Sequence, residues 1–270
     1  MRNWSDLRKR ILTASVLGPL ALLCVWLGGA WWAALMALCV AGLSWEWVKL
    51  CGGSTREVPG ALVAPSVLAA GAASALGRPA LGMLILAAGM AATWLAARKA
   101  RARASWLAFG VLYIGLAGIA LVLLRNDSAV GRDNVIFLIL VVWASDIAAY
   151  VAGRSLGGAK LAPAISPNKT WSGAIGGLLG ASAVGLCAAL VLGPEGSPLW
   201  MIAISAVLSV ATQSGDMLES WIKRRFGVKD SSGLIPGHGG LLDRLDGVLV
   251  AAPLAALIAL AAGPGVHLWR

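Results

Sequence analysis

Residues 220–247 read SWIKRRFGVKDSSGLIPGHGGLLDRLDG and form the longest polar interruption in an otherwise hydrophobic chain. This segment holds five of the 22 Lys and Arg residues, three of the twelve Asp and Glu residues and one of the two His residues. A simple tether between hydrophobic segments would need only a few small residues. Lys, Arg, His, Asp and Gly together suit the binding of phosphate groups and of a hard metal ion.

The composition on either side of this segment places the protein in a membrane. Of the 270 residues, 59% are hydrophobic and 13% are charged, whereas a soluble domain carries about 25% charged residues. A chain of this size has no core large enough to bury such a surplus, so its solvent must be lipid. Four scattered cysteines without a CxxC pair are interpreted as buried apolar residues. We therefore predict an all-α, polytopic integral membrane protein without a separate soluble domain.

The hydrophobic runs predict about nine transmembrane helices of about 20 residues each. They cover residues 11–27, 30–50, 61–76, 79–97, 105–124, 135–153, 171–192, 198–216 and 248–262. The first run is longer than the hydrophobic region of a usual signal peptide, and no A-x-A site follows it, so we expect it to span. About four spans form an N-terminal region, 1–104, and the others form a C-terminal catalytic region, 105–270.

Basic and aromatic residues predict the orientation of these helices. With the N-terminus in the cytoplasm, 18 of the 22 basic residues lie in cytoplasmic segments, in agreement with the positive-inside rule. Segments 154–170 and 220–247 then both face the cytoplasm, and we expect the protein in the inner membrane. The net charge of +10 is thereby an orientation signal that needs no nucleic-acid partner. Four tryptophans near the two ends of the second helix are interpreted as interfacial: Trp31, Trp32, Trp45 and Trp47.

Two polar features lie close together in the middle of the chain. Asp146 sits in an otherwise apolar helix, where an acidic side chain costs about 2.5–3.5 kcal/mol at membrane depth. It could pair with a neighbouring helix for packing, or it could form the polar floor of a water-filled site. The SPNKTWSG segment at 166–173 places Lys169 beside a helix N-terminus, a common anion-binding arrangement, although Thr170 could simply cap that helix.

A third polar cluster begins at the end of the eighth helix. Asp216, Glu219 and Ser220 are spaced i, i+3, i+4 and share one helix face. Asp243 and Asp246 are three residues apart, and they share a face if they begin the last helix. Carboxylates that meet where two helices end would suit Mg²⁺, which takes one or two of them together with water and substrate phosphate. The alternative is a basic interfacial loop whose aspartates neutralise arginines, but such a loop has no use for a Gly-His-Gly-Gly turn.

The pattern from residue 220 to residue 246 is specific enough to indicate a family. The spacing Ser-x2-Lys-Arg-x4-Lys-Asp-Ser, followed by Pro-Gly-His-Gly-Gly-x2-Asp-Arg-x-Asp, closely resembles the signature of phosphatidate cytidylyltransferases, also called CDP-diacylglycerol synthases. The Ser-Pro-x-Lys-Thr motif at 166–170 and the spacing of Asp146, Tyr150 and Gly153 are similar to the family's as well. This diagnostic part covers residues 143–247, whereas the first hundred residues match only as hydrophobic helices.

The resemblance implies transfer of the cytidylyl group of CTP to phosphatidic acid, giving CDP-diacylglycerol and pyrophosphate. It also implies an all-helical homodimer in the lipid bilayer and a Mg²⁺ site, with room for a second cation such as K⁺ beside it. Metal-binding roles carry over to Asp216 and Asp243, and less directly to Asp246 and Asp146. The candidates for catalysis and phosphate binding are Lys169, Ser220, Lys223, Arg224, Lys229, His238 and Arg244.

The chemistry of that reaction agrees with these residue types. A lipid phosphate monoester has a second pKa of about 6, so it is already an anionic nucleophile at neutral pH. The reaction then needs charge neutralisation and in-line alignment rather than an activated Ser, Cys or His. His238 would donate to a phosphate or only order its own glycine turn. Two other functions stay open: a CTP-dependent polyprenol or lipid kinase, and a small transporter with Asp146 and Asp216 as intramembrane coupling residues.

Overall fold

The computed structural model describes residues 4–194, 196–235, 237 and 239–270, without the side chains of residues 4–12 and 14. The chain divides into two compact units, each described here by itself. The first unit consists of Met1–Asn126 and Phe226–Leu245, and the second of Asp127–Arg225 and Asp246–Arg270. The sequence analysis divided the chain at residue 104 into an N-terminal region and a catalytic region. That division is based on function rather than on packing, and it stays a prediction.

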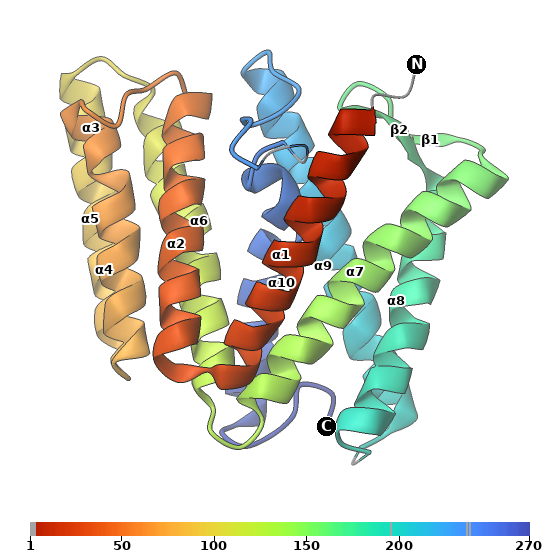
Figure 1. Ribbon diagram of the computed structural model, residues 1–270. Helices are drawn as coiled ribbons and strands as arrows, with labels where there is room; N and C mark the ends of the chain where they lie inside the picture. Colours follow the sequence, from red (N-terminus) through yellow and green to blue (C-terminus); the bar gives the residue numbers. More distant parts are fainter. Residues whose placement is uncertain (1–3, 195, 236, 238) are drawn as a thin grey trace. The chain divides into compact units, whose positions relative to one another are not determined.

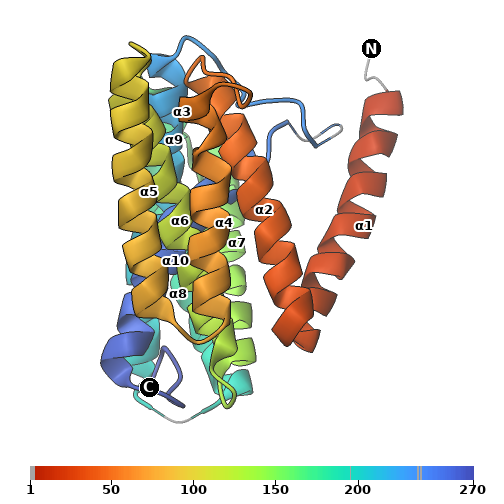
Figure 2. The same ribbon diagram turned by 90° about the vertical axis from the view of Figure 1, so that its left-hand side faces the viewer.

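Six helices precede residue 127 in the first unit (Figure 1). They are α1 (Trp4–Leu27), α2 (Gly29–Leu50), α3 (Val58–Ala61), α4 (Val63–Ala75), α5 (Pro79–Lys99) and α6 (Ala104–Asn126). Helices α2, α4, α5 and α6 pack against one another. Helix α1 meets α2 at a turn where Gly28 has a φ of 64°, and the two diverge from there (Figure 2). Arg125 of α6 holds this turn, because its guanidinium donates to the carbonyl oxygens of Val25 (2.7 Å) and Trp26 (3.2 Å).

The second unit contains three long helices and a small hairpin. They are α7 (Gly131–Leu156), β1 (Lys160–Ala162), β2 (Ser166–Thr170), α8 (Trp171–Leu192) and α9 (Pro198–Arg225). Helix α10 (Leu242–Ala262) begins in the segment assigned to the first unit and continues in the second. The two antiparallel strands pair Lys160 with Thr170 and Ala162 with Ser166. The sequence predicted only a polar connection here, and strands of three and five residues leave little periodicity to detect.

Eight helical segments in the described part of the chain are long and apolar enough to cross a membrane. They are Gly29–Leu50, Val58–Ala75, Pro79–Lys99, Ala104–Asn126, Gly131–Leu156, Trp171–Leu192, Pro198–Arg225 and Leu242–Ala262. Each agrees with one predicted span to within a few residues, apart from the polar extensions of α9 and α10. Helix α1 adds the shorter apolar stretch Ser15–Leu27. The protein is therefore an all-helical, multi-pass membrane protein, as predicted.

Small residues let α7 and α8 approach closely. A Cβ atom at Gly173 would lie 2.9 Å from the carbonyl oxygen of Ala149. A Cβ atom at Gly177 would lie equally close, 2.9 Å, to the carbonyl oxygen of Ser145. Both contacts are with the backbone of α7, which cannot rotate away, so only glycine fits at this helix interface.

Two of the tryptophans interpreted as interfacial are instead buried in the first unit. Trp47 is 0% exposed, and its Nε1 donates to the carbonyl oxygen of Trp106 (2.8 Å). Trp32 is 3% exposed, and its Nε1 donates to the carbonyl oxygen of Leu121 (3.1 Å). A tryptophan near the end of a span can satisfy its single N–H inside a helix bundle as well as at the membrane surface. Trp31, which is 64% exposed, agrees with the original interpretation.

Candidate active site

A polar cavity of about 540 Å³ lies in the second unit, between α7, β2, α8 and α9. Its size is within the usual range for small-molecule sites. Asp146 of α7, Lys169 of β2 and Asp216 of α9 all line it. Tyr150, Arg154, Asn168 and Gln213 also contribute to its wall. Residues chosen from three separate sequence motifs are therefore brought to one cavity.

Lys169 and Asp216 form an ion pair inside this cavity. The distance from Lys169 Nζ to Asp216 Oδ2 is 2.6 Å, and the two side chains are 25% and 36% exposed. A pair with this exposure is worth at most about 1 kcal/mol of stability, so its main effect is to hold the two side chains in place. Both groups stay accessible, and a bound anion could take over the ammonium while a cation takes over the carboxylate.

The second unit also gathers two further carboxylates around Asp216. Asp146 and Asp246 both lie within electrostatic range of Asp216 and of Lys169. Three carboxyl groups and one ammonium group thus share this region, which gives the cluster a formal surplus of negative charge.

Two glycines bring the helices of this cluster together. A Cβ atom at Gly215 would overlap the carbonyl oxygen of Asp246, and one at Gly247 would lie 2.6 Å from Thr212 Cγ2. Because Gly215 and Asp216 are neighbours on α9, this close approach of α9 and α10 sets the spacing between Asp216 and Asp246.

The wall formed by β2 and α8 confirms one sequence prediction. Thr170 is the N-cap of α8, and its Oγ1 accepts a hydrogen bond from the backbone N–H of Gly173 (3.1 Å). The hydroxyl of Ser172 donates to the carbonyl oxygen of Gly157, which ties the helix start to the end of α7. Lys169 is therefore held next to a helix N-terminus whose partial positive charge favours anions.

The last turns of α9 carry three more of the predicted site residues. Glu219 is 1% exposed, and Lys223 Nζ lies 2.6 Å from its Oε2, so this lysine is paired within its own helix. Ser220 is half-buried on the same face of α9. Arg224 is exposed, and its Nε donates to the carbonyl oxygen of Ile165 in the hairpin turn (3.3 Å). Arg224 thus supports the strand that carries Lys169.

Asp243 lies in the first unit, near the start of α10, and its carboxylate is bound by its own loop. Its Oδ2 accepts hydrogen bonds from Ser231 N (3.1 Å), Ser231 Oγ (3.1 Å) and Gly240 N (2.9 Å). Lys229 and Arg244 are exposed on the same segment, and His238 lies outside the described residues. Asp243 and Asp246 share the start of α10, as predicted, while a common site for Asp216 and Asp243 stays a prediction.

Sequence reasoning missed Glu46, which contacts the same loop from α2. Glu46 is 0% exposed, and it accepts hydrogen bonds from the backbone N–H groups of Leu241 (2.8 Å) and Leu242 (2.7 Å). The signal was present in the sequence, since Glu46 is the one acidic residue of a 22-residue apolar helix. A lone acid in a spanning segment usually has a specific partner.

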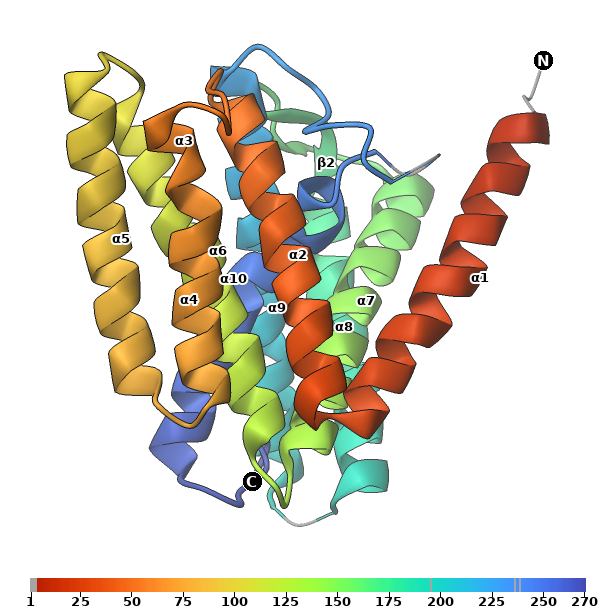
Figure 3. The ribbon, with the colours of Figure 1, turned by 60° about the vertical axis from the view of Figure 1, so that its left-hand side comes forward.

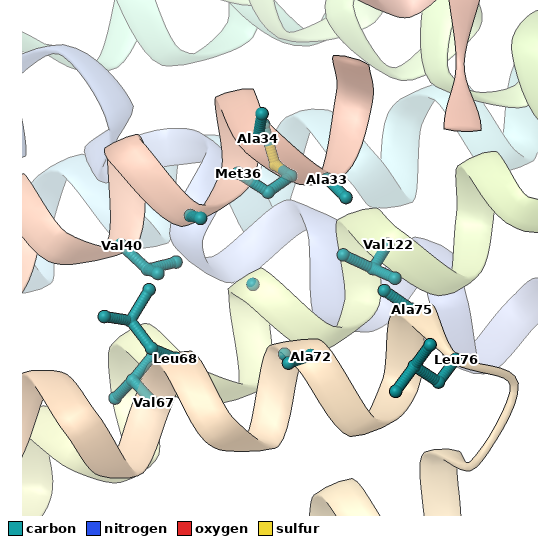
Figure 4. Close-up of a pocket in the computed structure, with 13 residues that line it drawn as sticks. Ala33, Ala34, Met36, Val40, Val67, Leu68, Ala72, Ala75, Leu76 and Val122 are labelled. Carbon is teal, nitrogen blue, oxygen red and sulfur yellow. The ribbon is translucent and has the colours of Figure 1, made fainter. Parts of the chain in front are cut away.

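A second cavity, of about 420 Å³, lies in the first unit between α2, α4 and α6 (Figure 4). Only Ala, Gly, Val, Leu and Met residues line it, among them Met36, Val67 and Val122. This lining offers no group that binds a phosphate or a metal ion. The polar cavity of the second unit is therefore the candidate active site.

Comparisons with known proteins agree with this assignment. The model of the cytidylyltransferase family matches residues 8–261. A protein of Brucella suis named phosphatidate cytidylyltransferase is 42% identical over 94% of this chain and 93% of its own length. The protein of that name from Pseudomonas aeruginosa is 36% identical, over 96% of this chain and 99% of its own length. Since the match extends over nearly the whole chain, helices of both units included, this protein belongs to the cytidylyltransferase family.

Proposed function

We propose that this protein transfers the cytidylyl group of CTP to phosphatidic acid, forming CDP-diacylglycerol and releasing pyrophosphate within the membrane. The observation that carries this proposal is a polar cavity lined by Asp146, Lys169 and Asp216 in a chain 42% identical to a phosphatidate cytidylyltransferase. The product is a membrane lipid, so the enzyme serves phospholipid biosynthesis. A multi-pass helical protein suits this reaction because one substrate keeps its acyl chains in the bilayer.

The residues of the cavity suit a reaction between two anions. The lipid phosphate is ionised at neutral pH and attacks the α-phosphate of CTP, and pyrophosphate leaves. Lys169 would neutralise and orient a phosphate at the N-terminus of α8. Arg224 and Lys223 lie near the end of α9, and Lys229, His238 and Arg244 lie in the following loop and helix start. We assign these residues to the phosphates of CTP, phosphatidic acid or pyrophosphate, and Ser220 to the same site.

The surplus of negative charge in the second unit fits a Mg²⁺ ion. We assign Asp216, Asp146 and Asp246 as residues that would hold it, together with Asp243, whose carboxylate is oriented by the donors of its own loop. No group of three or more His, Cys, Asp or Glu side chains in the described part of the chain forms a ready-made metal site. Mg²⁺ needs only one or two carboxylates from the protein, because it keeps several waters and takes substrate phosphates as ligands. When bound, it would neutralise the triphosphate, with room for a K⁺ ion beside it.

We further propose a homodimer in the inner membrane whose active site faces the cytoplasm. The support is the charge distribution, which places 18 of the 22 basic residues on one side when the N-terminus is cytoplasmic. CTP is a cytoplasmic nucleotide, so the site must open to that compartment. Phosphatidic acid would enter laterally from the bilayer.

The test uses purified protein in detergent with phosphatidic acid, Mg²⁺ and CTP labelled at either the α- or the γ-phosphate. We expect label from the α-position in the lipid phase and label from the γ-position in pyrophosphate. Transfer of the γ-label to the lipid would indicate the lipid kinase instead. No transfer of either label to lipid, from folded protein, would contradict the transferase and favour the transporter.

A further inference from the structure

Glu46 is a buried carboxylate that the proposed reaction does not use. It lies on α2 with 0% exposure, between Trp45 and the fully buried Trp47. A carboxylate in such a place is costly unless its oxygens are hydrogen-bonded. Glu46 lies on an N-terminal helix, whereas the acidic residues assigned to the site lie on α7, α9 and α10.

Three groups donate to the oxygens of Glu46, namely Leu241 N–H, Leu242 N–H and the Ser232 hydroxyl, and the Ser231 hydroxyl lies near them while it donates to Asp243. The backbone N–H groups of Leu241 and Leu242 donate at 2.8 Å and 2.7 Å. The hydroxyl of Ser232 donates at 2.5 Å, and that of Ser231 lies at 3.4 Å. Leu242 is the first residue of α10, so these N–H groups would lack a partner within their own helix. Glu46 therefore caps α10 from another helix, where a negative charge also favours the helix dipole.

The same loop connects Glu46 to Asp243. Ser231 Oγ lies 3.1 Å from Asp243 Oδ2 and 3.4 Å from Glu46 Oε2, so one hydroxyl stands between two carboxylates. Gly240, whose N–H donates to Asp243, fits tightly here, because a Cβ atom would overlap Ser231 Oγ and lie 2.9 Å from Glu46 Oε1. Any displacement of Glu46 would thus be passed to the groups that hold Asp243.

The first residue of this loop rests on the N-terminal helices as well. Phe226 packs edge-on against Trp106 of α6 at a centroid distance of 5.3 Å, and the Arg103 guanidinium lies 4.9 Å from its ring centre. The carbonyl oxygen of Trp106 accepts the hydrogen bond from Trp47, the neighbour of Glu46. Phe226 is therefore fixed to α6, and Leu241 and Leu242 are fixed to α2, while the described residues that follow Phe226 pass the end of α2 (Figure 3).

We propose that Glu46 is a positioning residue of this enzyme: its buried carboxylate holds Ser232, Leu241 and Leu242 and thereby fixes the place of Asp243. The effect on turnover rests on the proposed function, whereas the anchoring of the loop does not. The role of Glu46 in the reaction is exerted through Ser231 and the start of α10. The N-terminal helices thereby take part in positioning Asp243.

The variants Glu46→Gln and Glu46→Ala test this role, with Ser44→Ala as the matched control. Ser44 is also buried on α2, but its hydroxyl donates to Val40 of the same helix (2.6 Å). Glu46→Gln keeps the size and one acceptor while removing the charge, and Glu46→Ala removes every acceptor. If Glu46→Ala does not fold, Ser232→Ala removes only one of the three hydrogen bonds and keeps the test possible.

Two measurements read the result. Hydrogen–deuterium exchange of peptides covering residues 231–245, with no ligand added, should become about tenfold faster in Glu46→Gln, because the amide replaces one of the two acceptor oxygens and one buried N–H group loses its partner. Exchange in α4 and α6 should not change. In the transferase assay, KM for CTP and the Mg²⁺ concentration for half-maximal rate should rise about tenfold, with a smaller change in kcat. Combining Glu46→Gln with Ser231→Ala should give a less than additive loss, since both act through one hydroxyl.

Unchanged exchange over residues 231–245 in Glu46→Gln would overturn the anchoring role. Faster exchange with unaltered KM and Mg²⁺ dependence would overturn the role in the reaction and leave Glu46 as a stabilising residue only. Failure of the wild-type protein to transfer label would refute the proposed function and would leave the exchange result standing. Ser44→Ala should match the wild type in both measurements.

Discussion

A methyl group at position 215 tests how the acidic cluster of the second unit is assembled. In Gly215→Ala the new Cβ would come well within 3.0 Å of the carbonyl oxygen of Asp246, a distance that real Cβ atoms essentially never show, and 3.1 Å from the Cα of Gly247. An ordinary carbon–oxygen contact is about 3.3–3.6 Å, so α9 and α10 must separate by roughly 1 Å. We expect a loss of about 1–3 kcal/mol in stability from this overpacking.

The same shift should reduce activity more than it reduces stability. Asp216 follows Gly215 directly, and a misplacement of about 1 Å in a site that works by alignment can cost about 10²-fold in rate. The assay is transfer of α-labelled CTP to lipid, normalised to folded protein from thermal unfolding in detergent. Two matched variants rank the effect. Gly247→Ala meets a side chain, Thr212 Cγ2 at 2.6 Å, and should be milder, while Gly71→Ala on α4 meets nothing within 4 Å and should be neutral.

A result in which Gly215→Ala equals Gly71→Ala in both stability and rate would refute this reasoning. It would mean that α9 and α10 do not approach each other at this point, and that the spacing between Asp216 and Asp246 has another cause. Equal effects of Gly215→Ala and Gly247→Ala would leave the close approach but contradict the ranking by backbone contact.

Three further predictions address the cavity wall and the end of α2. Lys169→Gln should leave the melting temperature nearly unchanged, because its ion pair with Asp216 is worth at most about 1 kcal/mol. The same variant should raise KM for CTP about tenfold, whereas Lys160→Gln, which changes an exposed lysine, should leave KM unchanged. An unchanged KM in Lys169→Gln would contradict its role in phosphate binding. Thr170→Ala should cost about 1 kcal/mol of stability in thermal unfolding through loss of the α8 N-cap, and Thr170→Ser should restore it. Burial raises the pKa of the Cys51 thiol to about 12, so maleimide at pH 8 should label Cys51 only after unfolding. Peptide mapping by mass spectrometry measures this labelling, and fast labelling of the folded protein would contradict the burial of Cys51.

Most of the helices could be predicted from the sequence, because the length and hydrophobicity of a segment decide whether it can span a membrane. The seventh predicted span, residues 171–192, coincides with α8, and the Thr170 cap was visible as a threonine directly before an apolar run. Asp243 and Asp246 were predicted to begin the last helix, and α10 does begin at Leu242. In each case the deciding interactions lie within a few residues of one another along the chain.

Part of the candidate site also followed from the sequence. Asp146 was selected as an acidic residue within an apolar helix, and Lys169 and Asp216 as polar residues near helix ends, and one cavity contains all three. Charged side chains in or beside a membrane span are rare enough to indicate a function. The pairing of Lys223 with the buried Glu219 was not predicted, although their i, i+4 spacing on α9 permits it.

Contacts between distant parts of the chain could not be predicted. The donors to Glu46 follow it by 186 to 196 residues, and no local pattern connects them. Trp47 looked like an interfacial residue because only the packing of α2 against α6 places its indole in the core. The β1–β2 hairpin likewise depends on pairing between two strands too short to show a period of their own.

The most direct test of the central claim is an experimental structure of the full chain in a lipid bilayer with CTP and Mg²⁺. The proposed mechanism predicts the triphosphate in the cavity beside Lys169, with the carboxylates of Asp216 and Asp243 on the same cation. A structure that holds those two carboxylates too far apart to share an ion, or on opposite sides of the membrane, would contradict it.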